Sequence, residues 1–192
     1  GFDFDILNDL SQNIKILADK DISISIVLGG GNFIRGSSFS NGVVDRVTSD
    51  YMGMLGTVMN SLALQSNLEK IGVPSRVMTA ISINRVAEPY IKNKASRHLE
   101  KNRVVIFASG TGNPFFSTDT AAVLRASEMK SDVILKGTKV DGIYDKDPLT
   151  HDNANKISEI SYSDYLNQDI KVMDATAISL AKDRGLPIII FS

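Results

Sequence analysis

Short apolar runs rich in β-branched residues alternate with longer segments of helical spacing along this chain. The runs at residues 104–108 and 187–191 are apolar at every position, which is typical of strands buried on both faces of a parallel sheet. Parallel strands need crossover connections, and helices of this length supply them. The alternation therefore predicts an α/β domain whose mainly parallel sheet is covered by helices on both faces.

Apolar spacing sets the expected bounds of each element. We expect helices over residues 4–19, 49–71, 89–101, 118–130 and 174–184, and strands over residues 22–28, 75–78, 104–108, 133–135 and 187–191. The third helix is expected to begin at Pro89, because proline suits the first helical position. The expected buried face of the second helix consists of Met52, Leu55, Met59, Leu62 and Leu68. No linker or repeat divides the chain, so a single domain is expected over residues 1–192.

The composition excludes several classes of protein. A formal net charge of −1 at pH 7 gives no basic surface for nucleic acid or for a membrane. The chain contains no cysteine, so disulfides and thiolate chemistry are excluded. No apolar run approaches the roughly 20 residues that cross a bilayer, no signal peptide is apparent, and a cytoplasmic protein is expected. His98 and His151 lack the spacing of metal ligands, so no metal site built by the protein is expected.

Gly29, Gly30 and Gly31 directly follow the predicted strand over residues 22–28. Ligands of open α/β sheets lie at the carboxyl ends of the strands, and glycine lets backbone N–H groups approach an anion closely. Arg35 follows and could supply a forked contact to phosphate. The cluster also fits a tight structural turn, and the chain contains no Walker A loop.

Asp50 lies near the start of the predicted helix over residues 49–71. A carboxylate at that place is favoured by the helix dipole, and an N-cap is its commoner role. Beside a nucleotide pocket, the same carboxylate could accept hydrogen bonds from both ribose hydroxyls. The sequence leaves both roles open.

The loop over residues 109–120 leads from a buried strand into a predicted helix. Its glycines, hydroxyls and two aromatic residues suit a pocket for an anion and a ring at a helix N-terminus. The plainer alternative is an ordinary loop in which Phe115 and Phe116 are core residues and Ser117 or Thr118 is the helix N-cap.

The segment over residues 136–148 follows the predicted strand over residues 133–135. Its Asp-Gly and Asp-Pro pairs are turn signals, so a hairpin is the plainer expectation. Lys136, Lys139 and Tyr144 could instead hold a purine and its phosphates.

These segments together resemble the bacterial UMP kinases (uridylate kinases) of the amino-acid kinase family. The matching stretches are residues 29–36 (GGGNFIRG), 50–65 (DYMGMLGTVMNSLALQ), 110–118 (GTGNPFFST), 135–148 (LKGTKVDGIYDKDP) and 171–177 (KVMDATA). They span nearly the whole chain in the family's order, and their combination is very specific. The resemblance implies a three-layer α/β/α sandwich that transfers the γ-phosphoryl group of ATP to UMP, giving UDP and ADP in pyrimidine nucleotide biosynthesis.

The resemblance also implies roles for individual residues. UMP would be held by Gly30, Asp50, Thr111, Gly112, Asn113, Pro114, Phe115, Phe116, Ser117 and Thr118, with Asp50 on the ribose. ATP would be held by Gly31, Arg35, Thr138, Tyr144 and Asp147. Asp119 and Asp174 match family carboxylates that organise lysines around the phosphates. Since the acceptor is itself an anion, catalysis would rest on positioning and charge neutralisation rather than on a strong base.

Partners and assembly follow from the same resemblance. ATP would enter with Mg²⁺, the chain would form a homohexamer, and GTP would activate and UTP inhibit the enzyme. The family has a first strand ending in Lys-Leu-Ser-Gly and a last strand beyond the equivalent of Ser192, so residues 1–192 are expected to lack both. Ser117 stands where the family often has threonine, and it keeps the hydroxyl group.

The sequence leaves two other functions open. One is a kinase of the same fold that acts on an amino-acid carboxylate or on carbamate, and Asp50 and the 109–120 loop argue against it. The other is a non-catalytic nucleotide-binding protein for regulation or storage, which the missing lysine strand favours.

Overall fold

The computed structural model describes residues 1–34, 43–146, 148, 150–151, 153–168 and 170–192. The chain forms two compact units, here called the first unit (Gly1–Thr118) and the second unit (Asp119–Ser192). Arg35 and Asp147, which were both expected to bind ATP, lie outside the described residues. A single domain over residues 1–192 stays a prediction.

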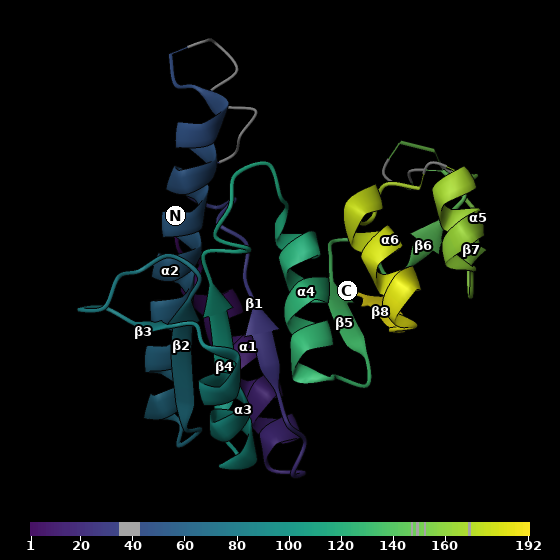
Figure 1. The fold of residues 1–192 in the computed structure, drawn as a ribbon. Helices are drawn as coiled ribbons and strands as arrows, with labels where there is room; N and C mark the ends of the chain where they lie inside the picture. The colour runs from purple at the N-terminus through teal and green to yellow at the C-terminus, as the bar shows by residue number, and fades with distance from the viewer. Residues whose placement is uncertain (35–42, 147, 149, 152, 169) are drawn as a thin grey trace. The chain divides into compact units, whose positions relative to one another are not determined.

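A four-stranded parallel sheet forms the centre of the first unit (Figure 1). Its strands lie in the order β1-β4-β2-β3, with bounds Ser25–Val27 (β1), Ser75–Thr79 (β2), Glu88–Pro89 (β3) and Val104–Ala108 (β4). Because β4 lies between β1 and β2, each of its residues is buried. The parallel sheet predicted from the alternation is confirmed, although the first strand is shorter than expected.

Helices cover both faces of this sheet. α1 (Phe4–Ala18) packs on α2 (Arg46–Lys70), which contacts β2 and β4, and the apolar cluster between them includes Ile14, Leu64 and Ile106. Side chains alternate along a strand, so Phe107 lies on the other face from Ile106. There its ring meets Tyr90 edge-on with 5.4 Å between centroids, and α3 (Lys92–Glu100) contacts β4.

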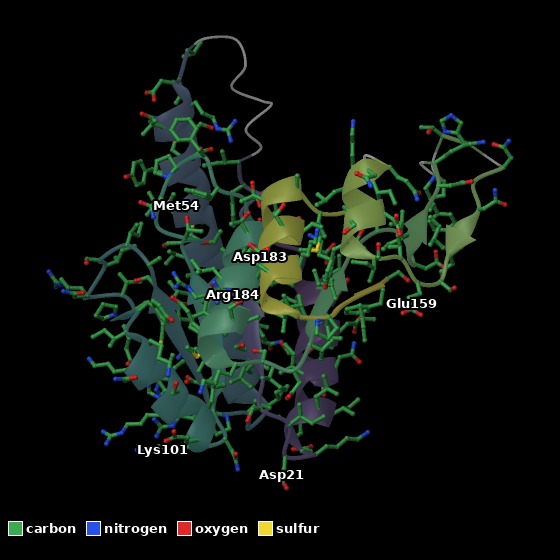
Figure 2. All side chains as sticks on the ribbon, turned by 45° about the vertical axis from the view of Figure 1, so that its right-hand side comes forward. Asp21, Met54, Lys101, Glu159, Asp183 and Arg184 are labelled. Atoms are coloured by element: carbon green, nitrogen blue, oxygen red, sulfur yellow. The ribbon has the colours of Figure 1, made fainter. Side chains whose placement is uncertain are left out.

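The buried side of α2 differs from the predicted one. Met54 (labelled in Figure 2), Val58 and Leu68 are buried. Leu55 and Met59, expected in the core, are 48% and 45% exposed. Apolar residues recur at helical spacing on two sides of this helix, so periodicity alone cannot tell which side meets the sheet.

The second unit has its own small sheets and core. β5 (Ile134–Gly137) pairs in parallel with β8 (Ile188–Phe191), and β6 (Ile143–Tyr144) pairs antiparallel with β7 (Lys156–Ile157). The helices are α4 (Thr118–Met129), α5 (Tyr162–Asn167) and α6 (Ala175–Arg184). Val123, Tyr165 and Ala177 are among the residues of their shared core. As expected, α6 ends at Gly185, whose φ of 61° is left-handed, and Arg184 (labelled in Figure 2) lies in the last turn.

Several element boundaries were predicted wrongly. α2 begins at Arg46 after the N-cap Asp45, so the alternative role of Asp50 as a cap is wrong. α3 begins at Lys92, because Pro89 belongs to the edge strand β3, where a missing N–H is tolerated.

Among the described residues of the range 136–148, no two strands pair as the expected hairpin. β6 pairs with β7 across residues 145–155 instead. The short helix α5 was not expected at all. No helix among the described residues is long and apolar enough to cross a membrane.

Candidate functional site

The glycine-rich turn after β1 is fixed against the middle of α2. The backbone of Gly30 comes so close to Gly53 that a methyl group on Gly30 would lie 2.4 Å from the Gly53 carbonyl oxygen. The Asn60 side chain donates a 2.7 Å hydrogen bond to the Gly29 carbonyl. The turn is therefore held against α2 through Gly30, which is buried.

Gly31 is placed differently from its neighbour. It is exposed, whereas Gly30 is buried. No atom of the described residues lies within 4 Å of the point where a Cβ on Gly31 would stand. The glycine therefore puts no side chain over this exposed backbone, which is a property of anion-binding turns.

Asp50 lies one turn inside α2 and faces the loop that follows β4. Its Oδ2 accepts a 2.8 Å hydrogen bond from the backbone N–H of Phe115. Nε of Arg46 donates to both carboxylate oxygens, at 2.9 and 3.0 Å. The Asp50 side chain is 20% exposed and that of Arg46 is 66% exposed, so a ligand can reach this carboxylate from solvent.

The loop over residues 109–118 presents its aromatic side chains to solvent. Phe115 and Phe116 are 68% and 52% exposed, so the alternative in which both are core residues is wrong. Gly112, at a φ of 80°, lies so close to Ala80 that a Cβ would stand 3.1 Å from the Ala80 carbonyl oxygen. The close approach of Gly112 to Ala80, and not burial of the two phenylalanine rings, holds this part of the loop in place.

All the residues expected to hold UMP belong to the first unit. Thr111 and Asn113 bond to each other at the loop tip, where the Asn113 N–H donates to Thr111 Oγ1 at 3.2 Å. Pro114, Ser117 and Thr118 complete the same loop. The structure thus brings this loop and Asp50 together, and it places Gly30 against α2, the helix that carries Asp50.

The two expected catalytic carboxylates, Asp119 and Asp174, belong to the second unit. Asp119 lies in the first turn of α4 and accepts a hydrogen bond from the Lys136 ammonium on β5. Both side chains are partly exposed, Asp119 by 20% and Lys136 by 27%. An ammonium carries three donors, so Lys136 can meet a phosphate oxygen while it stays bound to Asp119.

Asp174 joins two helices of the second unit. Its Oδ1 accepts from the Ala177 N–H at 3.0 Å, which caps α6, and from the Thr120 hydroxyl of α4 at 3.2 Å. An open pocket of about 280 Å³ beside it is lined by residues that include Tyr165 and Lys171. Burial raises the pKa of Tyr165, and its hydroxyl stays protonated and donates to the Met173 carbonyl.

Thr138 and Tyr144, expected to hold ATP, also lie in the second unit. The Thr138 N–H donates to the Phe191 carbonyl at 2.9 Å, which fixes the exit from β5. The Tyr144 hydroxyl donates to Asp141 at 2.6 Å. Hydrogen bonds from Lys156 and then from Tyr144 lower the pKa of Asp141, and this carboxylate in turn raises the pKa of Tyr144.

The second unit suits a magnesium ion that arrives with its nucleotide better than one held by protein side chains alone. Asp119 is bound to Lys136 and Asp174 caps α6, so both are already engaged. Within the described part of the chain, no group of three or more His, Cys, Asp or Glu side chains could hold a metal ion. Mg²⁺ commonly binds through phosphates, waters and only one or two carboxylates. Such an ion needs no cage built by the protein.

Sequence reasoning missed Arg46, and it expected Asp119 to organise lysines without naming Lys136 as its partner. The i,i+4 spacing of Arg46 and Asp50 is a signal that could have indicated their contact. The sequence indicates both Lys136 and Asp119 as candidate residues, but no local pattern indicates that they contact each other.

A parallel sheet flanked by helices, with glycine-rich turns at its strand ends, defines an α/β protein of the class that binds phosphorylated ligands. Residues 2–192 match the model of the amino acid kinase family. The chain belongs to this family.

Relatives of known name are similar over the whole chain. A uridylate kinase from Sulfurimonas denitrificans is 56% identical over 191 residues, which cover 99% of this chain and 81% of that protein. The crystal structure of UMP kinase from Ureaplasma parvum matches with a TM-score of 0.95 at 40% identity, over all of this chain and 81% of the other. UMP kinase from Bacillus anthracis matches with a TM-score of 0.96 at 41% identity, over all of this chain and 80% of the other. The amino-acid kinase fold expected from the sequence motifs is confirmed.

Proposed function

We propose that this chain is a UMP kinase, which transfers the γ-phosphoryl group of ATP to UMP and gives UDP and ADP. The observation that carries the proposal is the contact between Asp50 and the Phe115 N–H. It joins a carboxylate that can accept hydrogen bonds from ribose hydroxyls to the Gly-Thr-Gly-Asn-Pro-Phe-Phe loop. The identity of 56% to a uridylate kinase supports the same substrate.

UMP occupies the surface formed by Asp50, Gly30 and the loop over residues 111–118. A carboxylate offers about four lone-pair positions, and Asp50 uses one of them for Phe115. The ribose hydroxyls take positions that the exposed Arg46 side chain occupies in the free protein. Loop backbone and hydroxyl groups meet the uracil ring and the phosphate.

ATP binds through the exposed backbone of Gly31 and through Thr138 and Tyr144. Arg35 and Asp147, outside the described residues, complete this set in the proposal. Lys136 meets the transferring phosphoryl group, and Asp119 fixes the direction of its ammonium. Asp174 supports Lys136 and Asp119 indirectly, because it holds the start of α6 to α4.

The acceptor oxygen of UMP is already an anion, so no residue has to act as a strong base. Mg²⁺, if it enters with ATP, would supply neutralisation of the phosphate charge. The protein's own residues then have two tasks: they align the two phosphates, and they stabilise the charge that spreads over the moving group.

Assembly into a homohexamer, with GTP as activator and UTP as inhibitor, belongs to the same proposal. The exposed apolar stripe of α2 supports assembly: Val47, Tyr51, Leu55 and Met59 recur every four residues and are between 38% and 48% exposed. Apolar stripes of this kind on a helix commonly mark contacts between chains. A role in nucleotide biosynthesis carries with it a cytoplasmic location, which cell fractionation tests.

A panel of acceptors tests the substrate class. ADP release from Mg-ATP is measured with UMP, CMP, dUMP, an amino-acid carboxylate and carbamate, each supplied separately. We expect turnover with UMP well above all the others. Turnover with a carboxylate or carbamate but not with UMP would support the competing kinase and would reject the proposed function.

A further inference from the structure

Two residues of the loop over residues 109–118 that are not glycine adopt a left-handed backbone. Ser109 has a φ of 65° and Phe115 a φ of 72°. Residues with a side chain rarely adopt this conformation unless neighbouring groups hold them in it. The N–H of each is bound by a side chain of α2: Asp50 binds that of Phe115, and Thr57 binds that of Ser109 at 2.7 Å.

Thr57 is well placed for this bond. It is 4% exposed, and its Oγ1 donates to the Met54 carbonyl at 2.6 Å while it accepts from Ser109. The donated bond fixes the hydroxyl rotor, so its lone pair points at the Ser109 N–H. The hydroxyl of Ser109 has no hydrogen-bond partner among the described residues, so its side chain adds no hydrogen bond to the one that its N–H makes with Thr57.

One face of α2 therefore touches both glycine-rich loops. Asp50, Gly53, Thr57 and Asn60 follow each other at helical spacing, and all four contact a loop. Thr57 holds the first residue of the loop after β4, and Asp50 holds the same loop near its end. Gly53 and Asn60 hold the turn after β1.

We propose that Thr57 is a positioning residue for the acceptor nucleotide: its buried hydroxyl holds the first residue of the 109–118 loop in the conformation that receives UMP. This rests on the proposed function, because that loop is the proposed UMP site. Thr57 does not touch the substrate. It acts through Ser109 and keeps the loop ready before the substrate arrives.

This role has a specific kinetic consequence. Without the tie, Ser109 can leave its left-handed conformation, and only a fraction of the molecules carry a loop that binds UMP. The apparent affinity falls by that fraction, whereas saturating UMP restores the competent loop and hence kcat. Gly31, proposed to bind ATP, lies in the turn that is held to α2 by backbone atoms of Gly30 and Gly53, so loss of the Thr57 hydroxyl is expected to leave the KM for ATP unchanged.

The test compares variants of the full chain in steady-state kinetics and in thermal melts. Thr57→Val keeps the shape and removes the hydroxyl, whereas Thr57→Ser restores it. Ser61→Ala is the matched control, because Ser61 is also buried on the next turn of α2 and, among the described residues, its hydroxyl donates within the helix, to the Thr57 carbonyl at 2.8 Å. We expect Thr57→Val to raise the KM for UMP about tenfold, with kcat and the KM for ATP within about twofold of wild type.

Each outcome decides between positioning and packing. A raised KM for UMP in Thr57→Val that Thr57→Ser restores, with no such change in Ser61→Ala, supports the proposal. A lower melting temperature with an unchanged KM for UMP, or a rise in both KM values, overturns it. If Thr57→Val does not fold, Thr57→Ala compared with Thr57→Ser gives the same decision. A wild-type protein that neither binds nor phosphorylates UMP rejects the proposed function, and this proposal with it. A wild type that turns over UMP while Thr57→Val keeps its KM rejects this proposal alone.

Discussion

Alanine at Gly30 and alanine at Gly31 are chemically the same change at neighbouring positions, but we expect different results. At Gly30 the new methyl group would stand 2.4 Å from the Gly53 carbonyl oxygen. At Gly31 the methyl group would meet no atom of the described residues within 4 Å. The first change disturbs the contact between the turn and α2, and the second changes only the surface that a ligand approaches.

The cost at Gly30 follows from the size of the overlap. Carbon and oxygen atoms that are not bonded do not approach within 3.0 Å, so the turn or α2 has to move by at least about half an ångström. Overpacking of this kind costs about 1–3 kcal/mol. For a protein of this size, we expect the melting temperature of Gly30→Ala to fall by about 3–10 °C.

The cost at Gly31 appears only when ATP is present. The methyl group meets no atom of the described residues, so the melting temperature is expected to stay within about 2 °C of wild type. A backbone N–H that is hydrogen-bonded to a charged phosphate contributes roughly 1.5–3 kcal/mol, and a methyl group in its path removes that contact. The KM for ATP is therefore expected to rise about 10- to 100-fold.

Thermal melts and steady-state kinetics on the two variants check both statements. Gly29→Ala is the control, because its Cβ would lie 4.0 Å from Thr118 Oγ1, an ordinary contact. A Gly30→Ala protein as stable as wild type would refute the close approach of the turn to α2. A Gly31→Ala protein with an unchanged KM for ATP would refute the role of Gly31 in phosphate binding.

Three further changes test other parts of the site and of the assembly. Asp50→Asn is expected to raise the KM for UMP about 10- to 100-fold in kinetic assays, because hydrogen bonds to a charged acceptor contribute roughly 1.5–3 kcal/mol; an unchanged UMP affinity in a folded protein would contradict the ribose contact. Lys136→Gln is expected to lower kcat about 100-fold or more while the melting temperature barely changes, and a kcat within about twofold of wild type would remove Lys136 from the catalytic group. Leu55→Lys combined with Met59→Lys is expected to reduce the mass measured by light scattering, whereas an unchanged mass would place this stripe outside the contacts between chains.

The sequence alone predicts the sheet and most helices because their signals are local. The apolar run over residues 104–108 and the spacing within α1 and α6 give the right elements. α5 is short, but Ser161 followed three residues later by Asp164 is a helix-start signal that could have indicated it.

Other features depend on contacts between distant residues. Asp50 meets Phe115, which is 65 residues away, and Thr57 meets Ser109, which is 52 residues away. No local pattern distinguishes a buried threonine that binds a loop from one that only fills space. For the same reason, the sequence does not show which side of α2 is exposed. Met54 and Leu55 each belong to an apolar row at helical spacing, but Met54 is buried and Leu55 is exposed. The candidate residues could therefore be named from sequence, but the contacts that position them could not.

The fate of the γ-phosphoryl group tests the central claim most directly. The wild-type chain is incubated with Mg²⁺, ATP labelled at the γ-phosphate, and UMP, and the labelled products are separated. The account predicts that the label moves to UDP, and that this transfer depends on UMP. Label that stays in ATP although both nucleotides bind would contradict the account and would favour a regulatory or storage protein.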